Sequence, residues 1–431
     1  MKSVVRAVRG MRDLLPGEGA LWDKISAQIA AIFTAYSYDP IALPLVEFTE
    51  LFARGVGEAT DIVEKEMYTL ADRDGESLAL RPEGTAGCVR ALQEHGLLYN
   101  QTQRVSYAGP MFRYEKPQKG RYRQFYQIGA EAFGFAGPDI DAELIALGYS
   151  CWRQLGINDL VTLQINSLGS SESRAAYRKA LLTFLSPHES ALDEDSQRRL
   201  KTNPLRILDS KDPATQKIVA DAPKMIDFVD TQSREHFEGL QLLLRELQIP
   251  FQVNDKLVRG LDYYTHTVFE WVTESLGSQG AVCAGGRYDG LVEVLGGRAM
   301  PAAGFAIGLD RVVLLHQLAH ADASTEALAD VAIYVCFPAE GQAGQALQTA
   351  AWLRDRLPGL RIRTNAGGGN LGKQLKRADK CGATWAVIVE EQAGVVLSEG
   401  FRVSLKHLRD RDFGQAEYTL GEATQQMRDS D

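Results

Sequence analysis

The stretch GPMFRYEKPQKGRYRQFYQIGAEAFG, from Gly109 to Gly134, carries the strongest local signal in this sequence. Between Arg113 and Arg123 it holds five basic side chains and a single acidic one, Glu115. The whole chain is acidic, with a formal net charge of −9, which argues against a broad basic surface that coats nucleic acid. A basic island on an acidic protein indicates an anionic ligand held at a defined place, with a solvated charged face as the alternative.

The sequence around this stretch changes character along the chain. Apolar residues at helical spacing predict an amphipathic helix over residues 21–36. Short strands and helices are mixed up to about residue 165. The region of about 168–249 is charged, rich in helix formers and broken by prolines, which indicates a helical insertion. Glycine-punctuated, strand-like sequence returns at 251–307, so we expect the first sheet to resume there.

The last third of the chain predicts a second domain. Residues 319–329 are rich in Ala, Asp and Ser without an apolar period, which predicts a linker. We therefore divide the chain into residues 1–325 and 326–431. Strands and helices alternate beyond the linker, which predicts a small α/β domain with a largely parallel sheet. The stretch 361–380 of this domain is a second basic island, with six basic residues against Asp379.

Length and composition limit the classes of protein to which this chain can belong. A chain of 431 residues that is 45% hydrophobic is expected to form two or three globular domains. Residues 1–15 lack the apolar run of a signal peptide, and no stretch of about 18 apolar residues occurs. These features predict a cytoplasmic protein without a membrane partner. The cysteines are odd in number and widely spaced, so we expect reduced, buried thiols rather than disulfides or a metal site.

Two shorter motifs need a separate interpretation. GGGNLGK, residues 367–373, nearly satisfies a phosphate-binding loop, but Gln374 stands where Ser or Thr should hold Mg²⁺. We interpret it as a helix start open to RNA phosphates or bases, or as a simple glycine turn. HQLAH places His316 and His320 one helical turn apart without the Glu of a zinc motif, which favours a helix surface.

Several separated segments together resemble the class II aminoacyl-tRNA synthetases. IALPLVE around Pro44 resembles the dimer-interface motif of that class, the stretch 109–134 its ATP-site motif, and GFAIGLDRV, residues 304–312, its terminal arginine motif. LVRGLDYYTHTVFEW, residues 257–271, and AGGRYDGL, residues 284–291, narrow the resemblance to the histidyl-tRNA synthetase family. The resemblance runs over essentially the whole chain.

The resemblance implies an α+β catalytic domain with a six-stranded antiparallel sheet, interrupted by the helical insertion. It also implies a C-terminal α/β domain that binds the tRNA anticodon stem, and a homodimer. Tyr114 and Lys116 depart from the His and Arg expected in close relatives. Lys116 keeps the positive charge but not the fork geometry of arginine, so its contact with phosphate or tRNA differs from the family pattern.

The reaction that the resemblance implies joins the histidine carboxylate to the α-phosphate of ATP. Two anions must be brought together, so the site needs positive charge and rigid orientation. By resemblance, Arg113 binds the α-phosphate, Arg121 and Arg311 the γ-phosphate, and Arg259 the carboxylate and the α-phosphate. Mg²⁺ is expected to neutralise the departing pyrophosphate. Ordinary surface or salt-bridged arginines are the alternative, which the position of each one inside a matching motif disfavours.

The resemblance assigns the remaining site residues to adenine and to histidine. Glu115 accepts from the adenine amino group and Phe125 stacks on the ring, although Phe125 is equally suited to a core. The imidazole, with its donor and acceptor nitrogens, is expected to face Glu131, Tyr264 and Tyr288. The alternative for these three is an ordinary place in the sheet. The α-amino group of the substrate is assigned to Glu83, Thr85 and Gln127.

The implied function is that of an ATP-dependent histidine–tRNA ligase, with L-histidine, ATP and histidine tRNA as substrates. One alternative is a non-catalytic, histidine-sensing regulatory paralogue, which usually lacks the C-terminal domain and degrades the arginine and LVRGLDYY segments. A second is a ligase of the same fold that makes an amide and has no need of the basic C-terminal domain. A third is an RNA-binding scaffold without enzymatic activity.

Overall fold

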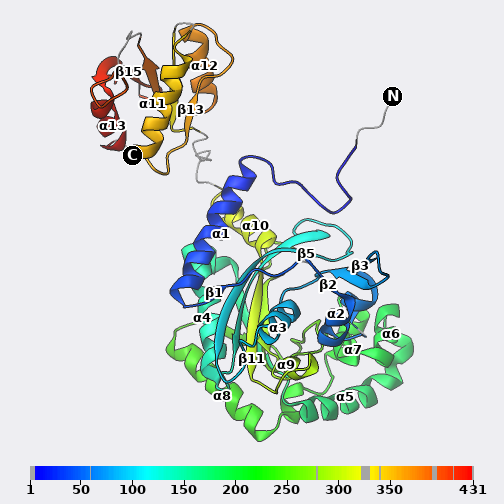
Figure 1. Ribbon diagram of the computed structural model, residues 1–431. Coiled ribbons are helices and arrows are strands. Elements are labelled where there is room, and N and C mark those ends of the chain that lie inside the picture. Colours follow the sequence, from blue (N-terminus) through cyan, green and yellow to red (C-terminus); the bar gives the residue numbers. More distant parts are fainter. Residues whose placement is uncertain are drawn as a thin grey trace. The chain divides into compact units, whose positions relative to one another are not determined.

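A large β-sheet dominates the first part of the chain, with helices packed around it (Figure 1). The computed structural model describes residues 5–58, 60–277, 280–321, 331–338, 341–390, 396–410 and 412–429. The chain divides into two compact units, one formed mostly by residues up to His320 and the other mostly by those from Ala321 onward. The predicted linker and the predicted boundary at 325–326 lie largely outside the described residues.

Within the described residues, the large sheet has eight strands in the order β1-β5-β6-β11-β10-β9-β7-β8. The six from β5 to β7 in this order run antiparallel to their neighbours, which confirms the predicted sheet. The short edge strand β8 begins at Phe251, where strand-like sequence was expected to return, and it pairs in parallel with β7. The two-residue edge strand β1, which pairs in parallel with β5, was not predicted. The bounds are Asp39–Pro40 (β1), Gln103–Phe112 (β5), Gln124–Phe133 (β6), Thr162–Ser167 (β7), Phe251–Val253 (β8), Thr265–Val272 (β9), Ala281–Arg287 (β10) and Ala302–Gly308 (β11).

The helices around this sheet follow the apolar periodicity of the sequence. Helix α1 spans Glu18–Ala35 and buries Trp22, Ile25, Ile29 and Phe33, so the predicted amphipathic helix is confirmed. Helices α3 and α10 contact β6, and α4 contacts β10 and β11. The bounds are Thr49–Val56 (α2), Thr85–Glu94 (α3), Pro138–Gln154 (α4), Leu291–Val294 (α9) and Leu309–Ala319 (α10), with single turns at Ile62–Glu66 and Asn158–Leu160.

A small antiparallel sheet with the order β2-β4-β3 follows α1 in the chain. Its strands are Val46–Phe48 (β2), Tyr68–Ala71 (β3) and Ser77–Leu80 (β4). The IALPLVE segment enters β2, where Leu45, Val46 and Phe48 are exposed apolar residues.

The predicted helical insertion is confirmed as a set of helices between β7 and β8. Ser170, Asp193, Asp212 and Asp230 cap its four longer helices by accepting backbone N–H bonds. Tyr177, Leu181, Ile207 and other buried residues give the insertion a hydrophobic core of its own. The bounds are Ser171–Leu185 (α5), Glu194–Thr202 (α6), Pro213–Val219 (α7) and Thr231–Glu246 (α8), with short turns at Ser186–Ala191, Pro204–Ile207 and Met225–Phe228.

The second unit is an α/β domain built on a sheet with the order β13-β12-β14-β15-β16. Strands β13, β12 and β14 are parallel, but β15 and β16 are antiparallel, so the prediction of a largely parallel sheet was only partly right. Strands β15 and β16 and helix α13 were not predicted. The bounds are Ile333–Cys336 (β12), Ala343–Arg356 (α11), Ile362–Thr364 (β13), Leu371–Lys380 (α12), Trp385–Val389 (β14), Arg402–His407 (β15), Gln415–Thr419 (β16) and Leu420–Asp429 (α13).

Two expectations from composition concern the molecule as a whole. In the described part of the chain, no helix is both long enough and apolar enough to cross a membrane. All the cysteines are free thiols, and all but the half-buried Cys381 are buried. Burial raises the pKa of the Cys151 and Cys336 thiols to about 12, so these groups are uncharged and packed in the interior.

Candidate active site

A cavity beside the large sheet brings together most of the residues predicted to form the site. Its wall includes Glu83, Thr85, Arg113, Glu115, Arg121, Phe125, Gln127, Arg259, Tyr264 and Arg311. These residues come from β6, the N-terminus of α3, the start of α10 and the loops that precede β6 and β9. Glu131 and Tyr288 are buried behind the wall and do not line the cavity.

The loop 113–123 joins β5 to β6 and folds back on itself. The Arg113 N–H donates to the Arg123 carbonyl at 2.9 Å, and Gln118 and Arg121 exchange backbone bonds of 3.0 and 2.9 Å. Gly120 lies in the left-handed region at φ 74° inside this turn. The hairpin therefore points Arg113 and Arg121 at the same cavity.

The arginines of the cavity crowd positive charge into a partly buried space. Burial and the neighbouring charges of Arg121 and Arg113 lower the pKa of Arg311 to about 10. Burial also lowers the pKa of Arg113 and of Arg121. Such mutual repulsion is relieved when a multivalent anion binds between the cations, because each one then gains an opposite charge.

Arg259 reaches the cavity from the loop before β9. Its Nη1 donates to Glu270 Oε1 at 2.7 Å, while its buried Nε has no hydrogen-bond partner within the described residues. Burial opposes the charge, but Glu270 and the nearby tyrosines outweigh it and raise the pKa of Arg259. A fixed cation with an unpartnered donor on a cavity wall is suited to hold an oxyanion.

The two residues assigned to adenine both line the cavity. Glu115 forms an ion pair with Arg121, although the resemblance assigned these side chains to different parts of ATP. Phe125 packs against the main core of the domain, and the guanidinium carbon of Arg113 lies 5.2 Å from its ring centre. Phe125 thus contributes to the core and also to the cavity wall.

The residues assigned to the substrate amino group lie where α3 begins. Both Glu83 oxygens accept backbone N–H bonds of α3, from Thr85 at 2.7 Å and from Ala86 at 2.9 Å. Burial raises the pKa of Glu83 despite these bonds. The buried Oε1 of Gln127 has no partner among the described residues. A carboxylate beside an unpaired acceptor suits an ammonium group.

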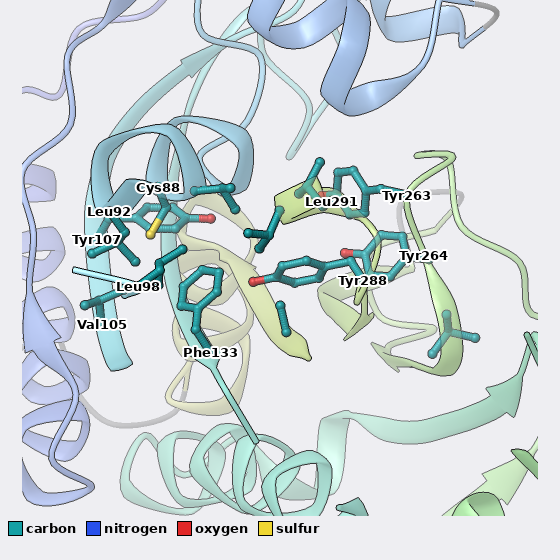
Figure 2. Packing of buried hydrophobic residues seen from close by; sticks show 14 of the residues in the cluster. Cys88, Leu92, Leu98, Val105, Tyr107, Phe133, Tyr263, Tyr264, Tyr288 and Leu291 are labelled. Carbon is teal, nitrogen blue, oxygen red and sulfur yellow. The ribbon is translucent and has the colours of Figure 1, made fainter. Parts of the chain in front are cut away.

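Glu131 lies at the centre of a buried cluster of hydroxyl groups. Its Oε1 accepts from Thr85 Oγ1 at 2.7 Å and from the Tyr107 hydroxyl at 3.2 Å, and its Oε2 accepts from the Tyr288 hydroxyl. Figure 2 shows Tyr107 and Tyr288 extending toward one central region from opposite sides. Burial raises the pKa of Glu131 to about 8. The carboxyl group is therefore enclosed by the protein's own donors.

Gly304, in the terminal arginine motif, makes room for this carboxyl group. It pairs with Glu131 across β11 and β6. A Cβ at position 304 would lie 1.6 Å from Glu131 Oε2, a separation that atoms cannot adopt. The glycine is thus required by the packing around Glu131.

Several residues of the site were not predicted. Tyr107 reaches Glu131, and Asp310 accepts from the Tyr126 N–H at 3.0 Å and from Arg12 at 3.1 Å. Glu270, the partner of Arg259, lies inside the segment 257–271 that carried the resemblance, so its place in that motif was an available signal. Asp310 likewise lies inside the motif 304–312, whereas Tyr107 lies outside the quoted motifs and its partner Glu131 is distant in sequence.

The structure also describes Tyr114 and Lys116, which depart from the family pattern, and the glycine-rich motif 367–373. Tyr114 packs below the guanidinium carbon of Arg123, 3.6 Å from the ring centre, and Lys116 is exposed. Gly367, Gly368 and Gly369 all have positive φ and lead into α12, whose N-cap is Asn370. Gln374 is buried and donates to the Phe337 carbonyl at 2.7 Å, which makes it part of the interior.

No metal centre is evident in the described part of the chain. The His316 and His320 rings stack at 4.1 Å, and no group of three or more His, Cys, Asp or Glu side chains there could hold a metal ion. The cavity wall does carry the carboxylates of Glu115 and Glu270. This donor set fits an ion such as Mg²⁺ that is held chiefly by substrate phosphates and completed by a carboxylate or water.

An antiparallel sheet beside an arginine-lined cavity, with a helical insertion and a separate α/β domain, defines a class II aminoacyl-tRNA synthetase fold. The family model for histidyl-tRNA synthetase matches residues 10–312. The chain therefore belongs to the histidyl-tRNA synthetase family.

Solved structures extend this similarity to the whole chain. Apo histidyl-tRNA synthetase from S. aureus is 31% identical with a TM-score of 0.78, and the match covers 99% of this chain and 100% of that one. Histidyl-tRNA synthetase from Nostoc sp. PCC 7120 shares the fold at 21% identity and a TM-score of 0.68, over 99% of each chain. An ATP phosphoribosyltransferase regulatory subunit/histidyl-tRNA synthetase from Bacillus halodurans C shares the fold at 21% identity and a TM-score of 0.65. This match covers 91% of this chain and 100% of that one.

Proposed function

We propose that this protein is a histidine–tRNA ligase. It activates L-histidine with ATP to histidyl-adenylate and pyrophosphate, and then transfers the histidine to the 3′ end of its cognate tRNA. The observation that carries the proposal is the shared cavity, where four arginines from three separate segments face the carboxylate of Glu83 and the amide of Gln127. This arrangement suits a ligand that carries a polyphosphate, a carboxylate and an ammonium group.

In the first step, a carboxylate oxygen of histidine attacks the α-phosphorus of ATP. A new P–O bond forms, the bond to the bridging α–β oxygen breaks, and pyrophosphate leaves with that electron pair. Arg113 and Arg259 lie on the cavity wall at positions suited to the reacting oxygens, and Arg121 and Arg311 to the outer phosphates. Bound Mg²⁺ would neutralise the pyrophosphate, with Glu270 or Glu115 available beside it. No protein nucleophile is needed, because fixed charge and orientation lower the barrier.

The second step, transfer of histidine to the tRNA, needs no further charged side chain of the protein. A ribose hydroxyl oxygen at the tRNA 3′ end attacks the histidyl carbonyl carbon, the bond to the phosphate oxygen breaks, and AMP departs with the electron pair. The hydroxyl proton passes to the departing phosphate or to water. We assign anticodon-stem binding to the C-terminal unit, which carries the basic stretch 361–380.

The same proposal includes a cytoplasmic homodimer. The exposed apolar residues Leu45, Val46, Phe48 and Leu70, on and beside the small sheet, support an interface there. Sedimentation analysis of the purified protein measures the oligomeric state, and fractionation of cells measures the compartment.

Amino-acid-dependent ATP–pyrophosphate exchange, measured across all twenty amino acids, tests the proposal. We expect exchange with histidine alone, followed by charging of histidine tRNA. The alternative of a non-catalytic, histidine-sensing regulatory paralogue predicts histidine binding without exchange. An amide-forming ligase would require a different acceptor, and an RNA-binding scaffold would bind tRNA without consuming ATP.

A further inference from the structure

The loop between β8 and β9, residues 254–264, connects the candidate site to the helical insertion. This substrate loop carries Arg259 and Tyr264, which both line the cavity. Leu257 belongs to the core below the cavity, whereas the next residue, Val258, packs against that core and against the separate core of the insertion. The loop is therefore held between two hydrophobic clusters, one of which belongs to the insertion.

Arg174 of α5 makes the most direct contact between the insertion and this loop. Its Nη1 donates to the carbonyl of Asp262 at 3.0 Å and to the carbonyl of Tyr264 at 2.5 Å. One guanidinium group thus fixes the backbone on both sides of Tyr263. Arg174 does not itself line the cavity. Any effect that it has on a ligand must pass through the substrate loop.

Other insertion residues hold the same part of the loop. Asn203 Nδ2 donates to Asp262 Oδ1 at 2.8 Å. Arg206 lies against the loop at Gly260, where a Cβ would come within 2.5 Å of its Nη1. From the other side, the Asp262 N–H donates to the Val56 carbonyl at 3.1 Å. Polar contacts with the insertion thus converge on Asp262, close to Tyr264.

We propose that Arg174 is a positioning residue for the amino-acid site, acting through the backbone of the substrate loop. The inference rests on the proposed function and deepens it, since it makes the helical insertion part of histidine activation before any tRNA binds. The Arg259 guanidinium carbon lies 5.6 Å from the centre of the Tyr264 ring, and this pairing depends on the loop backbone. Without Arg174 the loop gains conformational freedom that the ligand must remove on binding.

The test compares Arg174→Ala and Arg174→Lys with a matched control, Arg178→Ala. Arg178 is on the same helix and its charge also acts on Asp262, but its hydrogen bond goes to the Thr202 carbonyl at 3.1 Å, inside the insertion. The control therefore removes a similar charge without removing a hydrogen bond to the substrate loop. Histidine-dependent ATP–pyrophosphate exchange without tRNA is measured on the full-length protein. We expect Arg174→Ala to raise the KM for histidine about 10- to 100-fold, the range for losing hydrogen bonds from a charged group.

Two further comparisons separate positioning from general damage. The KM for ATP should rise much less, because Arg113, Arg121 and Arg311 come from other elements. Arg174→Lys should restore part of the histidine KM, since an ammonium group can reach one carbonyl but not match the guanidinium fork. A histidine KM for Arg174→Ala equal to that of Arg178→Ala would overturn the inference.

A second variant keeps the test decisive if Arg174→Ala does not fold. Asn203→Ala removes the other hydrogen bond from the insertion to Asp262 and should also raise the histidine KM, by a smaller factor. Unchanged values of the histidine KM in both Asn203→Ala and Arg174→Lys would contradict the proposal.

A calorimetric measurement of histidine binding without ATP is independent of catalysis. If the wild-type protein lacks exchange, the proposed function fails, while weaker histidine binding by Arg174→Ala than by Arg178→Ala still supports the positioning role.

Discussion

The arginines on the cavity wall and the carboxyl group buried behind that wall differ in how their hydrogen bonds are satisfied. On the side of the arginines, Arg259 keeps a buried Nε without a partner among the described residues. On the side of the buried carboxylate, both oxygens of Glu131 already accept hydrogen bonds from hydroxyl groups of the protein. The arginine side thus has an unused donor, whereas the Glu131 carboxyl group could bind a ligand only by exchanging one of its present partners.

The difference follows from the cost of burying each kind of charge. Burial lowers the pKa of Arg311, and repulsion by Arg121 and Arg113 lowers it further, so a bound anion removes an unfavourable interaction. Glu131 is buried without a cation beside it, and desolvation raises its pKa to about 8. This carboxyl group therefore keeps its proton to a higher pH than a solvated glutamate does. The arginine side is suited to stabilise developing charge, and the Glu131 side to select the ligand.

The largest expected effect is on the arginine side. Arg259→Ala should cut the rate of adenylate formation on the order of 10²–10³-fold, the loss seen for one preorganised electrostatic donor. Binding of histidine and ATP should change much less, because the cation acts mainly on charge that develops in the transition state. Single-turnover adenylation at saturating histidine, ATP and Mg²⁺ measures the effect. A near-normal rate would make Arg259 structural and reopen the regulatory alternative.

A smaller effect is expected on the opposite side. Glu131→Ala should raise the KM for histidine roughly 5- to 150-fold, since one lost buried partner costs about 1–3 kcal/mol. The KM for ATP serves as the internal control and should stay close to the wild-type value. If turnover and KM with histidine are both unchanged, Glu131 has no part in reading the imidazole.

The hydroxyl groups around Glu131 permit a finer comparison. Tyr288→Phe removes the donor to Glu131 Oε2, and Tyr107→Phe removes the longer of the two bonds to Oε1. We expect Tyr288→Phe to raise the histidine KM by up to about tenfold, in line with one net hydrogen bond. Tyr107→Phe should have less effect, because Thr85 still donates to the same oxygen. An unchanged histidine KM in both variants would show that the cluster is only structural.

The last prediction concerns stability and pH instead of catalysis. Burial raises the Glu131 pKa from 4.5 to about 8, so the unfolded chain releases this proton at lower pH than the folded protein does. The associated stabilisation is complete below about pH 4.5 and is lost as pH rises toward 8. Glu131→Gln stays neutral, so its stability relative to wild type should increase across this window. Melting temperatures of both proteins between pH 5 and 8.5 measure it, and parallel curves would contradict the raised pKa.

Sequence patterns were sufficient where the signal is local. The six antiparallel strands, α1 and the helical insertion follow from periodicity, helix formers and the resemblance. The edge strand β1 was missed because a strand of two residues contains no measurable period. Strands β15 and β16 were missed as well. Strand β15 pairs with β14 and strand β16 pairs with β15, but no strand was predicted after β14.

The sequence by itself identified the candidate side chains of the site, because its four arginines and most of its acids lie inside contiguous motifs. Only the tertiary structure decided what each of them touches. Glu131 meets Thr85 and Tyr107 from other elements, and the backbone beside Tyr264 meets Arg174 from the insertion. These contacts join residues far apart in the chain, and no local pattern encodes them. Burial among these contacts raises the pKa of Glu131 and holds the substrate loop in one conformation. Desolvation and packing depend on every element around a group, so they follow from the tertiary structure alone.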